Sequence, residues 1–295
     1  ITDPEGAIKI AELQPKLPNL AYIITPEKTP LPESAPLQAL DTAADDPALL
    51  IYTSGTTGAP KGALHAHRVL PGHLPGVEMS HNRFPMENDC IWTPADWAWI
   101  GGLLDVLMPG LHHGMPVVAS RMDKFSAEGC GKIIEKGGVK NVFFPPTALK
   151  MLKAANAKLP GLRTVACGGE PLGAEMLIWG KEALGVTINE FYGQTECNMV
   201  VSSCAELFEP RPGAIGRPVP GHQVSVIDET GKAAAGEGDI AIREGTPVMM
   251  LEYWNNPAAT KAKFRKAPDG SRWLLTGDRG VMEDGFIRFV GRDDD

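Results

Sequence analysis

The sequence has little that would tie it to a membrane, to nucleic acid or to an oxidising compartment. No apolar run approaches the ~20 residues that a membrane-spanning helix needs, and the first residues do not form a secretory signal peptide. Acidic side chains outnumber basic ones and give a net charge of −8, which argues against nucleic acid as the main partner. A local site in an acidic protein can still be positive, so a phosphorylated small molecule remains a compatible ligand.

Cysteine is also sparse. The five cysteines are scattered and contain no C-x-x-C pair: Cys90, Cys130, Cys167, Cys197 and Cys204. This arrangement is typical of reduced thiols in a cytoplasmic protein, and it argues against a disulfide framework and a zinc site. We expect Cys197 and Cys204 to pack in the core, because nothing near them marks a nucleophile.

Apolar side chains, in contrast, are plentiful. Hydrophobic residues make up 43% of the chain and charged residues 22%, so its 295 residues suffice for one large packed domain or two smaller ones. The sequence begins with Ile1 rather than Met and stops inside a charged run at Asp295. We therefore expect it to be part of a longer protein. Nothing in the sequence defines an oligomeric state.

The distribution of proline and of apolar runs predicts four parts. Residues 1–47 form an N-terminal segment, with one helix within 3–20, that ends in a proline-rich linker. Residues 48–209 form an α/β subdomain, residues 210–292 a β subdomain, and residues 293–295 the start of a hinge.

Strand-like and helix-like segments alternate within the α/β subdomain. The expected strands are 48–52, 90–93, 116–119, 139–144, 163–167 and 186–191, and the expected helices are 100–111, 127–136, 147–155 and 174–184. This alternation predicts a mostly parallel sheet flanked by helices. Ligand sites in such sheets lie at the carboxyl ends of strands. We therefore look for chemistry in the loops after Tyr52, Cys167 and Phe191, and expect these loops to converge at one edge of the sheet.

The β subdomain has a different pattern. Short strand-like runs lie at 223–227, 239–243, 273–276 and 286–290, and turns such as Glu229-Thr230-Gly231 and Glu283-Asp284-Gly285 separate them. This pattern predicts a small antiparallel, barrel-like β unit.

The segment after the first expected strand is dense in glycine and hydroxyl groups: Thr53-Ser54-Gly55-Thr56-Thr57-Gly58-Ala59-Pro60-Lys61-Gly62. Glycines let backbone N–H groups approach an anion, and hydroxyls and a lysine add donors and positive charge. The segment is therefore predicted to bind phosphate. Its spacing differs from that of P-loop NTPases, since only two residues separate Gly55 from Gly58. A flexible surface turn is the alternative.

This loop resembles the signature of adenylate-forming enzymes, which include acyl-CoA synthetases, luciferases and the adenylation domains of peptide synthetases. Four more segments resemble motifs of that family and follow in its order: Gly168-Gly169-Glu170-Pro171, Tyr192-Gly193-Gln194-Thr195-Glu196, Thr276-Gly277-Asp278 and Gly291-Arg292-Asp293-Asp294. The resemblance covers nearly the whole chain and is strongest to the acetyl-CoA and medium-chain acyl-CoA synthetases.

The resemblance assigns roles to the phosphate side of the site. Lys61, Thr195 and Glu196 are the expected catalytic residues: Lys61 holds the departing phosphates, Thr195 holds the α-phosphate, and Glu196 binds Mg²⁺ as a hard oxygen ligand. The loop residues expected to bind the nucleotide are Thr53, Ser54, Gly55, Thr56, Thr57 and Gly58.

The resemblance also places the nucleoside and the acyl group. Residues expected around the nucleoside are Gly169, Glu170, Pro171, Tyr192, Asp278 and Arg292; Tyr192 would stack on adenine and Asp278 would bind the ribose hydroxyls. Trp99, Gly193 and Asn198 are expected to line the acyl pocket. Acetyl-CoA synthetases carry a tryptophan at the position matched by Gly193, so a glycine is expected to leave space for a longer or branched acyl group.

The histidines invite a second hypothesis. His65 with His67, and His112 with His113, suggest a metal site, but each pair lacks a third ligand, and we expect no metal there. By resemblance, Leu64-His65 with His67 marks the start of the helix that follows the phosphate loop.

The implied reaction has two halves that use ATP, Mg²⁺ and CoA. A carboxylate attacks the α-phosphate of ATP and gives acyl-AMP and pyrophosphate, and CoA then displaces AMP. By resemblance, the chain lacks an N-terminal portion and a small C-terminal domain, and we expect residues 1–295 alone to be inactive in the overall reaction. The alternatives are a ligase that loads a carrier protein and a nucleotide-binding part without catalysis.

Overall fold

The computed structural model describes residues 2–26, 36–53, 59–120, 122, 124–170 and 172–292. It has two units, Ile1–Thr42 and Ala43–Asp295. In the first unit, Asp3 caps helix α1 (Pro4–Leu13), because its carboxylate accepts from the Gly6 N–H. The short helix η1 (Gln14–Lys16) follows α1. The predicted N-terminal helix is thereby confirmed. The finer boundaries near residues 47, 209 and 292 stay predictions.

The largest sheet lies in the second unit and has six strands. Their spatial order follows the chain: β3 (Ile91–Trp92), β4 (Asn141–Phe143), β5 (Thr164–Gly168), β6 (Ile188–Tyr192), β7 (Val201–Ser202) and β8 (Arg217–Pro218). The first four strands pair in parallel and the last two join antiparallel. The predicted mostly parallel sheet is confirmed.

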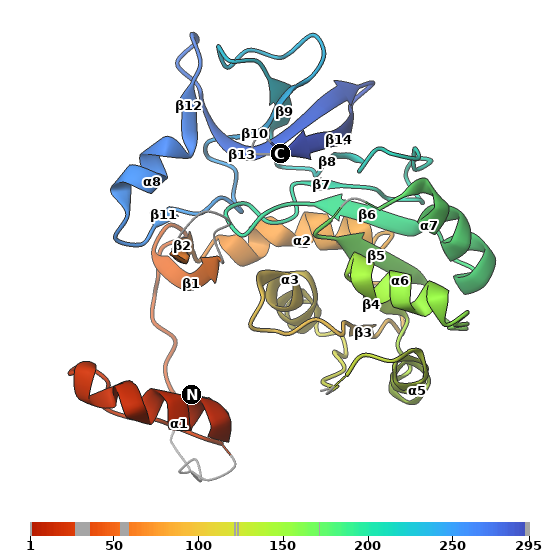
Figure 1. The fold of residues 1–295 in the computed structure, drawn as a ribbon, viewed down its shortest axis with the longest axis horizontal. Coiled ribbons are helices and arrows are strands. Elements are labelled where there is room, and N and C mark those ends of the chain that lie inside the picture. The colour runs from red at the N-terminus through yellow and green to blue at the C-terminus, as the bar shows by residue number, and fades with distance from the viewer. Residues whose placement is uncertain are drawn as a thin grey trace. The chain divides into compact units, whose positions relative to one another are not determined.

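Helices cover both faces of this sheet (Figure 1). They are α2 (Val69–Ser80), α3 (Ile100–Gly102), η2 (Leu103–Leu107), α4 (Met108–His112), α5 (Ala127–Gly137), α6 (Pro146–Ala154), α7 (Ala174–Trp179) and η3 (Gly180–Leu184). Alternate strand residues face alternate cores. Val142 and Val165 pack in the core that includes side chains of α5, α6 and α7, whereas Phe143 and Ala166 pack in the core that includes those of α2 and η2.

The strand expected at 116–119 is reduced to one bridge, between Val117 and Ile91. Pro116 has no N–H and cannot extend the ladder. By contrast, α5 matches its prediction closely because both ends carry a cap: the Ser126 hydroxyl accepts from the Gly129 N–H, and Gly138 takes a left-handed conformation with φ +61°.

The position of the first expected strand was wrong. Strand β1 (Pro47–Thr53) does not join the large sheet; it pairs antiparallel with β2 (Lys61–Ala66), which also pairs with β11 (Glu252–Tyr253). A short connection favours an antiparallel hairpin, because a parallel pair needs a long crossover. The expected helix start at Leu64-His65 and His67 was also wrong, since β2 runs to Ala66 and α2 begins at Val69.

The C-terminal part forms a curled antiparallel sheet, as predicted, and this sheet has five strands (Figure 1). Its strands are β9 (Val224–Ile227), β10 (Gly238–Arg243), β12 (Phe264–Lys266), β13 (Arg272–Glu283) and β14 (Phe286–Arg292), and helix α8 (Pro257–Ala262) precedes β12. The sheet order is β12-β13-β10-β9, and β14 also pairs with β13. Strand β12 was not predicted.

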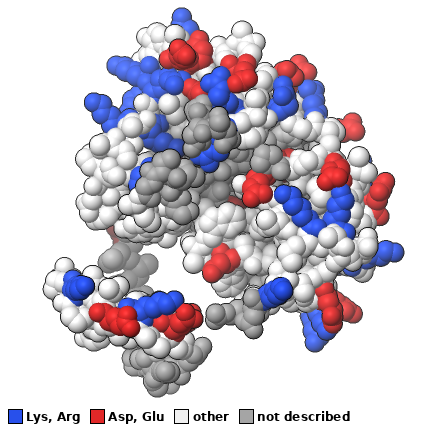
Figure 2. All heavy atoms as spheres, in the orientation of Figure 1, with Lys and Arg blue, Asp and Glu red and all other residues white. Residues whose placement is uncertain are grey.

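Charged side chains on this part are mixed in sign. Figure 2 shows Lys and Arg among Asp and Glu over the curled sheet. Several form ion pairs, including Arg272 with Glu244 at 2.5 Å and Arg279 with Glu237 at 2.7 Å. Three arginines of this sheet, Arg265, Arg272 and Arg279, are therefore balanced by carboxylates beside them.

Two further expectations concern cysteines and membranes. All five cysteines are free and buried, and Cys197 and Cys204 are fully enclosed in apolar clusters, as predicted. Within the described ranges, every helix is too short or too polar to cross a bilayer.

Candidate functional site

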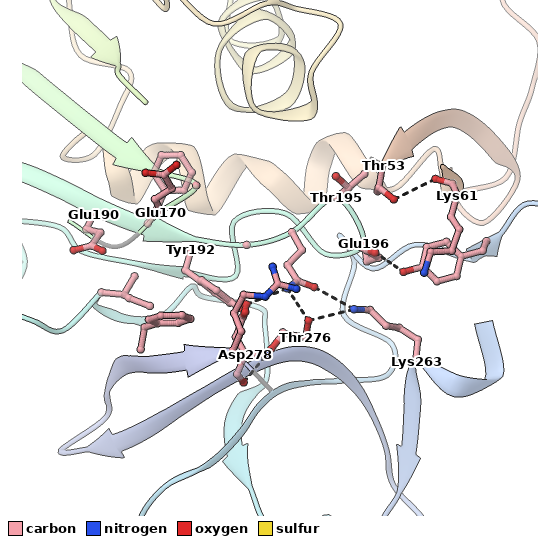
Figure 3. A pocket seen from close by; sticks show the side chains of 18 of the residues that line it. Thr53, Lys61, Glu170, Glu190, Tyr192, Thr195, Glu196, Lys263, Thr276 and Asp278 are labelled. Carbon is pink, nitrogen blue, oxygen red and sulfur yellow. Dashed lines mark hydrogen bonds between the residues drawn. The ribbon is translucent and has the colours of Figure 1, made fainter. Parts of the chain in front are cut away.

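A cavity of about 530 Å³ lies where the β6 end, the β1–β2 hairpin and the curled sheet meet (Figure 3). It is lined by Thr53, Ala59, Lys61, Gly169, Glu170, Glu190, Phe191, Tyr192, Gly193, Gln194, Thr195, Glu196, Ile215, Tyr253, Lys263, Thr276, Asp278, Phe289 and Arg292. Its walls therefore come from three separate sheets.

Most of the described candidate residues meet in this cavity. They are Thr53, Lys61, Gly169, Glu170, Tyr192, Gly193, Thr195, Glu196, Asp278 and Arg292. Ser54, Gly55, Thr56, Thr57, Gly58 and Pro171 lie outside the described residues. The described parts of the three loops line the same cavity, as expected, although the hairpin arrives from its own antiparallel sheet and not from a strand of the large one.

One end of the cavity is built on the carboxyl ends of β5 and β6. These strands are parallel neighbours, so the segments after them share an edge. Gly169 has φ +105°, a conformation that disfavours any other residue, and it turns the chain so that Glu170 also lines the cavity.

Tyr192 is fixed by a carboxylate from the curled sheet. Its hydroxyl donates to Asp278 Oδ2 at 2.6 Å, and Gln194 Nε2 donates to the same oxygen at 3.0 Å. Burial and the adjacent Asp278 raise the pKa of the Tyr192 hydroxyl well above its ordinary value. Asp278 is also a cross-strand neighbour of Arg292 in the β13–β14 pair. Strands distant in sequence thus combine an aromatic ring, a carboxylate and a guanidinium at this end.

The opposite end holds Glu196, Tyr253 and Lys61. The Tyr253 hydroxyl donates to Glu196 Oε1, and Lys61 Nζ lies 5.0 Å from the centre of the Tyr253 ring. Glu196 is 8% exposed. Burial, followed by the adjacent Glu196, raises the pKa of the Tyr253 hydroxyl, so this hydroxyl stays a donor. A carboxylate and an ammonium group on one cavity wall can hold a divalent cation together with an anion.

Two expected acyl-site residues lie outside the cavity lining. Trp99 is 42% exposed, with its ring centre 5.9 Å from that of Phe143. Asn198 is buried, and its amide donates to Asp105 Oδ1 at 2.6 Å. Burial raises the pKa of Asp105 well above its ordinary value. Asn198 therefore binds a buried carboxyl group within the protein.

Gly193 lines the cavity, but the open space expected beside it is absent. A Cβ at this position would lie 2.1 Å from the Met199 backbone nitrogen and 2.9 Å from Asn198 Cα. The missing side chain thus makes room for the backbone that follows Glu196. The prediction that Gly193 enlarges an acyl pocket was therefore wrong.

Replacing Gly193 by Ala is therefore expected to lower the free energy of unfolding by about 2–3 kcal/mol, because backbone atoms cannot rotate out of the way as a side chain can. Urea unfolding measures the change. Gly131→Ala in α5 is the control, since its Cβ would meet only Leu159 Cδ2 at 3.8 Å. A Gly193→Ala variant as stable as the Gly131→Ala variant would contradict the packing argument.

Several residues that line the cavity were not predicted from the sequence. Gln194 stands inside a recognised motif and was given no role, while Tyr253 and Lys263 carry no local motif at all. Glu190 was also missed; its Oε1 accepts from the Leu172 N–H at 3.1 Å, and burial raises its pKa to about 7. The only sequence signal for Glu190 was its place two residues before Tyr192 on a strand that ends at the site.

The histidines line no metal centre in the part of the chain that the structure describes, where no group of three His, Cys, Asp or Glu side chains is arranged to hold an ion. His65 is fully buried, and burial lowers its pKa to about 4. The Nε2 atom of His113 lies 3.3 Å from Glu78 Oε1.

The sequence is similar to a family of nucleotide-binding enzymes, which is consistent with the residues that line the cavity. The sequence profile described as AMP-binding enzyme matches residues 2–254. Acetyl-coenzyme A synthetase of Bacillus subtilis (strain 168) is 33% identical over 258 residues, which are 84% of this chain and 44% of that protein. The protein named acyl-coenzyme A synthetase ACSM4, mitochondrial, of Rattus norvegicus is 32% identical over 269 residues, 87% of this chain and 44% of that protein.

A solved structure shows the same fold. ATP-bound MatB from Rhodopseudomonas palustris superposes with a TM-score of 0.76 at 28% identity, and the match covers 88% of this chain and 51% of that chain. The chain spans about half the length of the curated relatives it matches. The family profile covers most of the chain, including every cavity-lining residue up to Tyr253. The chain therefore belongs to the AMP-binding enzyme family.

Proposed function

We propose that the protein containing this chain is an AMP-forming acyl-CoA synthetase that acts on a short- to medium-chain carboxylate. The observation that carries the proposal is the cavity itself, in which Tyr192 and Asp278 lie at one end and Lys61, Thr195 and Glu196 at the other. An aromatic ring and a carboxylate suit a nucleoside, and an ammonium, a hydroxyl and a metal-binding carboxylate suit its phosphates.

The nucleoside would lie at the Tyr192 end. Both Tyr192 and Gln194 donate to Asp278 Oδ2, so Oδ1 is the oxygen that ribose hydroxyls would reach. Gly169 and Glu170 would border the base, and Arg292, opposite Asp278 in the sheet, would add a donor. This arrangement fixes the sugar relative to the phosphates, which orientates the α-phosphate for attack.

The phosphates and Mg²⁺ would lie at the Glu196 end. Bound there, Mg²⁺ would neutralise phosphate charge during the displacement of pyrophosphate. The Glu196 carboxylate suits this cation as a hard oxygen donor held by the Tyr253 hydroxyl. Thr195 would donate to the α-phosphate, and Lys61 would hold the leaving phosphates together with the hydroxyl of Thr53.

The proposed acceptor of the acyl group, CoA, is based on the names of related proteins. Two of them are named as acetyl-coenzyme A and acyl-coenzyme A synthetases, which supports CoA over a carrier protein. Trp99 remains the proposed acyl-side aromatic. The five buried free thiols fit a cytoplasmic location.

Pyrophosphate release from the full-length gene product, measured against a panel of carboxylates with and without CoA, tests the function. We expect release to depend on a carboxylate and the acyl group to appear on CoA. ATP binding without pyrophosphate release for any acid would favour a nucleotide-binding part without catalysis. Transfer only to a carrier protein would favour the loading ligase.

A further inference from the structure

Lys263 is a cavity-lining cation that lies in none of the recognised motifs. It is the C-terminal cap of α8 and precedes β12, and its partly buried side chain enters the cavity (Figure 3). Its Nζ lies 3.3 Å from Gln194 Oε1 and 3.3 Å from the Thr276 carbonyl oxygen. The turn between α8 and β12 thus contributes an ammonium group to the site.

Its two partners place Nζ near the middle of the cavity. Gln194 directly precedes Thr195, and Thr276 lies two residues before Asp278. In Figure 3, Lys263 points inward, between the side that holds Lys61 and Glu196 and the side that holds Tyr192 and Asp278. The ammonium therefore lies between the proposed phosphate end and the proposed nucleoside end.

Two arginines of the curled sheet near Lys263 differ from it, because each pairs with a carboxylate. Arg265 pairs with Asp239, and Arg272 pairs with Glu244. Both partners of Lys263 among the described residues are uncharged. An ammonium has three N–H donors, and two of them meet neutral oxygen atoms here, which leaves one donor for a ligand. A partly buried charge of this kind is stabilised when an anion binds beside it.

We infer that Lys263 binds the α-phosphate of the nucleotide, and of the acyl-adenylate, from the side opposite Thr195. This inference rests on the proposed function and adds to it a phosphate-binding residue. The α-phosphate joins the nucleoside to the remaining phosphates, so it is the anionic group that must occupy the space between the two ends. A charge-assisted hydrogen bond there would favour AMP over adenosine.

The test compares AMP with adenosine by calorimetry on the full-length gene product. Lys263→Gln is expected to weaken AMP binding by roughly 10- to 100-fold, the range for one charge-assisted hydrogen bond, and to change adenosine binding less than about twofold. Lys263→Arg keeps the charge and should restore most of the AMP affinity. Lys261→Gln removes an exposed charge from the same helix and should leave both affinities unchanged.

The alternative is that Lys263 only clamps Gln194 to Thr276. In that case Lys263→Gln would weaken adenosine and AMP equally, or neither, and either result would overturn the inference. If the Gln variant failed to fold, Lys263→Met would replace it with the same expectations. Absence of both adenosine and AMP binding by the unmodified protein would instead overturn the proposed function, and the inference with it.

Discussion

Glu196→Gln is expected to slow pyrophosphate release by the full-length gene product roughly 100- to 1,000-fold, the effect typical of losing one strong electrostatic contact to a transition state. The amide keeps an oxygen that can accept from the Tyr253 hydroxyl, so the local packing survives. It lacks the negative charge with which a carboxylate stabilises bound Mg²⁺. A continuous pyrophosphate assay at saturating Mg²⁺ measures the loss.

Tyr253→Phe is the matched control, because it removes the hydrogen bond to Glu196 and leaves the charge. We expect it to lower the rate much less, and to preserve the ring face beside Lys61. AMP binding without metal should be equal in the Glu196→Gln and unmodified proteins. A Glu196→Gln variant within about fivefold of the normal rate would show that Glu196 is not the metal ligand.

Three buried histidines are expected to lower the free energy of unfolding by about 6 kcal/mol between pH 7.5 and pH 5, and Glu190 and Asp105, whose pKa values burial raises, to offset part of this loss. Burial lowers the pKa of His65 to about 4 and the pKa values of His73 and His81 to about 3. The folded state keeps these imidazoles neutral while the unfolded chain takes up protons below about pH 6.5. Each histidine therefore contributes stability above pH 6.5, and at pH 5 each has lost about 2 kcal/mol. Urea unfolding across this range measures the loss.

His73→Leu separates this cause from general acid sensitivity. The side chain is fully buried on α2, and its Nδ1 lies 2.7 Å from the Val69 carbonyl oxygen. The variant should lose about 2 kcal/mol less than the unmodified protein between pH 7.5 and pH 5. Leu152→Ala should lower stability equally at both pH values, since it removes only apolar packing. An unchanged pH dependence in His73→Leu would refute the assignment.

The sequence predicted best what local patterns determine. Alternating apolar runs predicted β4, β5 and β6, and parallel neighbours then require the segments after Gly168 and Phe191 to meet at one edge. The same logic misplaced β1, because the sequence alone did not show that residues 61–66 return as a strand. Local pattern identifies an element more reliably than its partner.

Site residues that lie in a recognised sequence motif were predictable, whereas site residues outside the motifs were not. Tyr253 and Lys263 reach the cavity through contacts with Glu196 and Gln194, which are distant in sequence. Gly193 was misjudged because a side-chain direction in irregular backbone cannot be derived from residue type. The contact of Asn198 with Asp105 was not predictable, because Asp105 lies on a helix with no sequence signal for it.

The hydrogen bond from Tyr192 to Asp278 closes a loop of the chain across 86 residues. Such distant contacts form late, because the entropy lost in closing the loop precedes any gain from the contact. During synthesis, the parallel strands β3 to β6 emerge well before Asp278, so a growing chain would have a core before it had a complete nucleotide site. Nucleotide binding would then act as a check on finished folding, stabilising only chains in which the curled sheet has closed over β6.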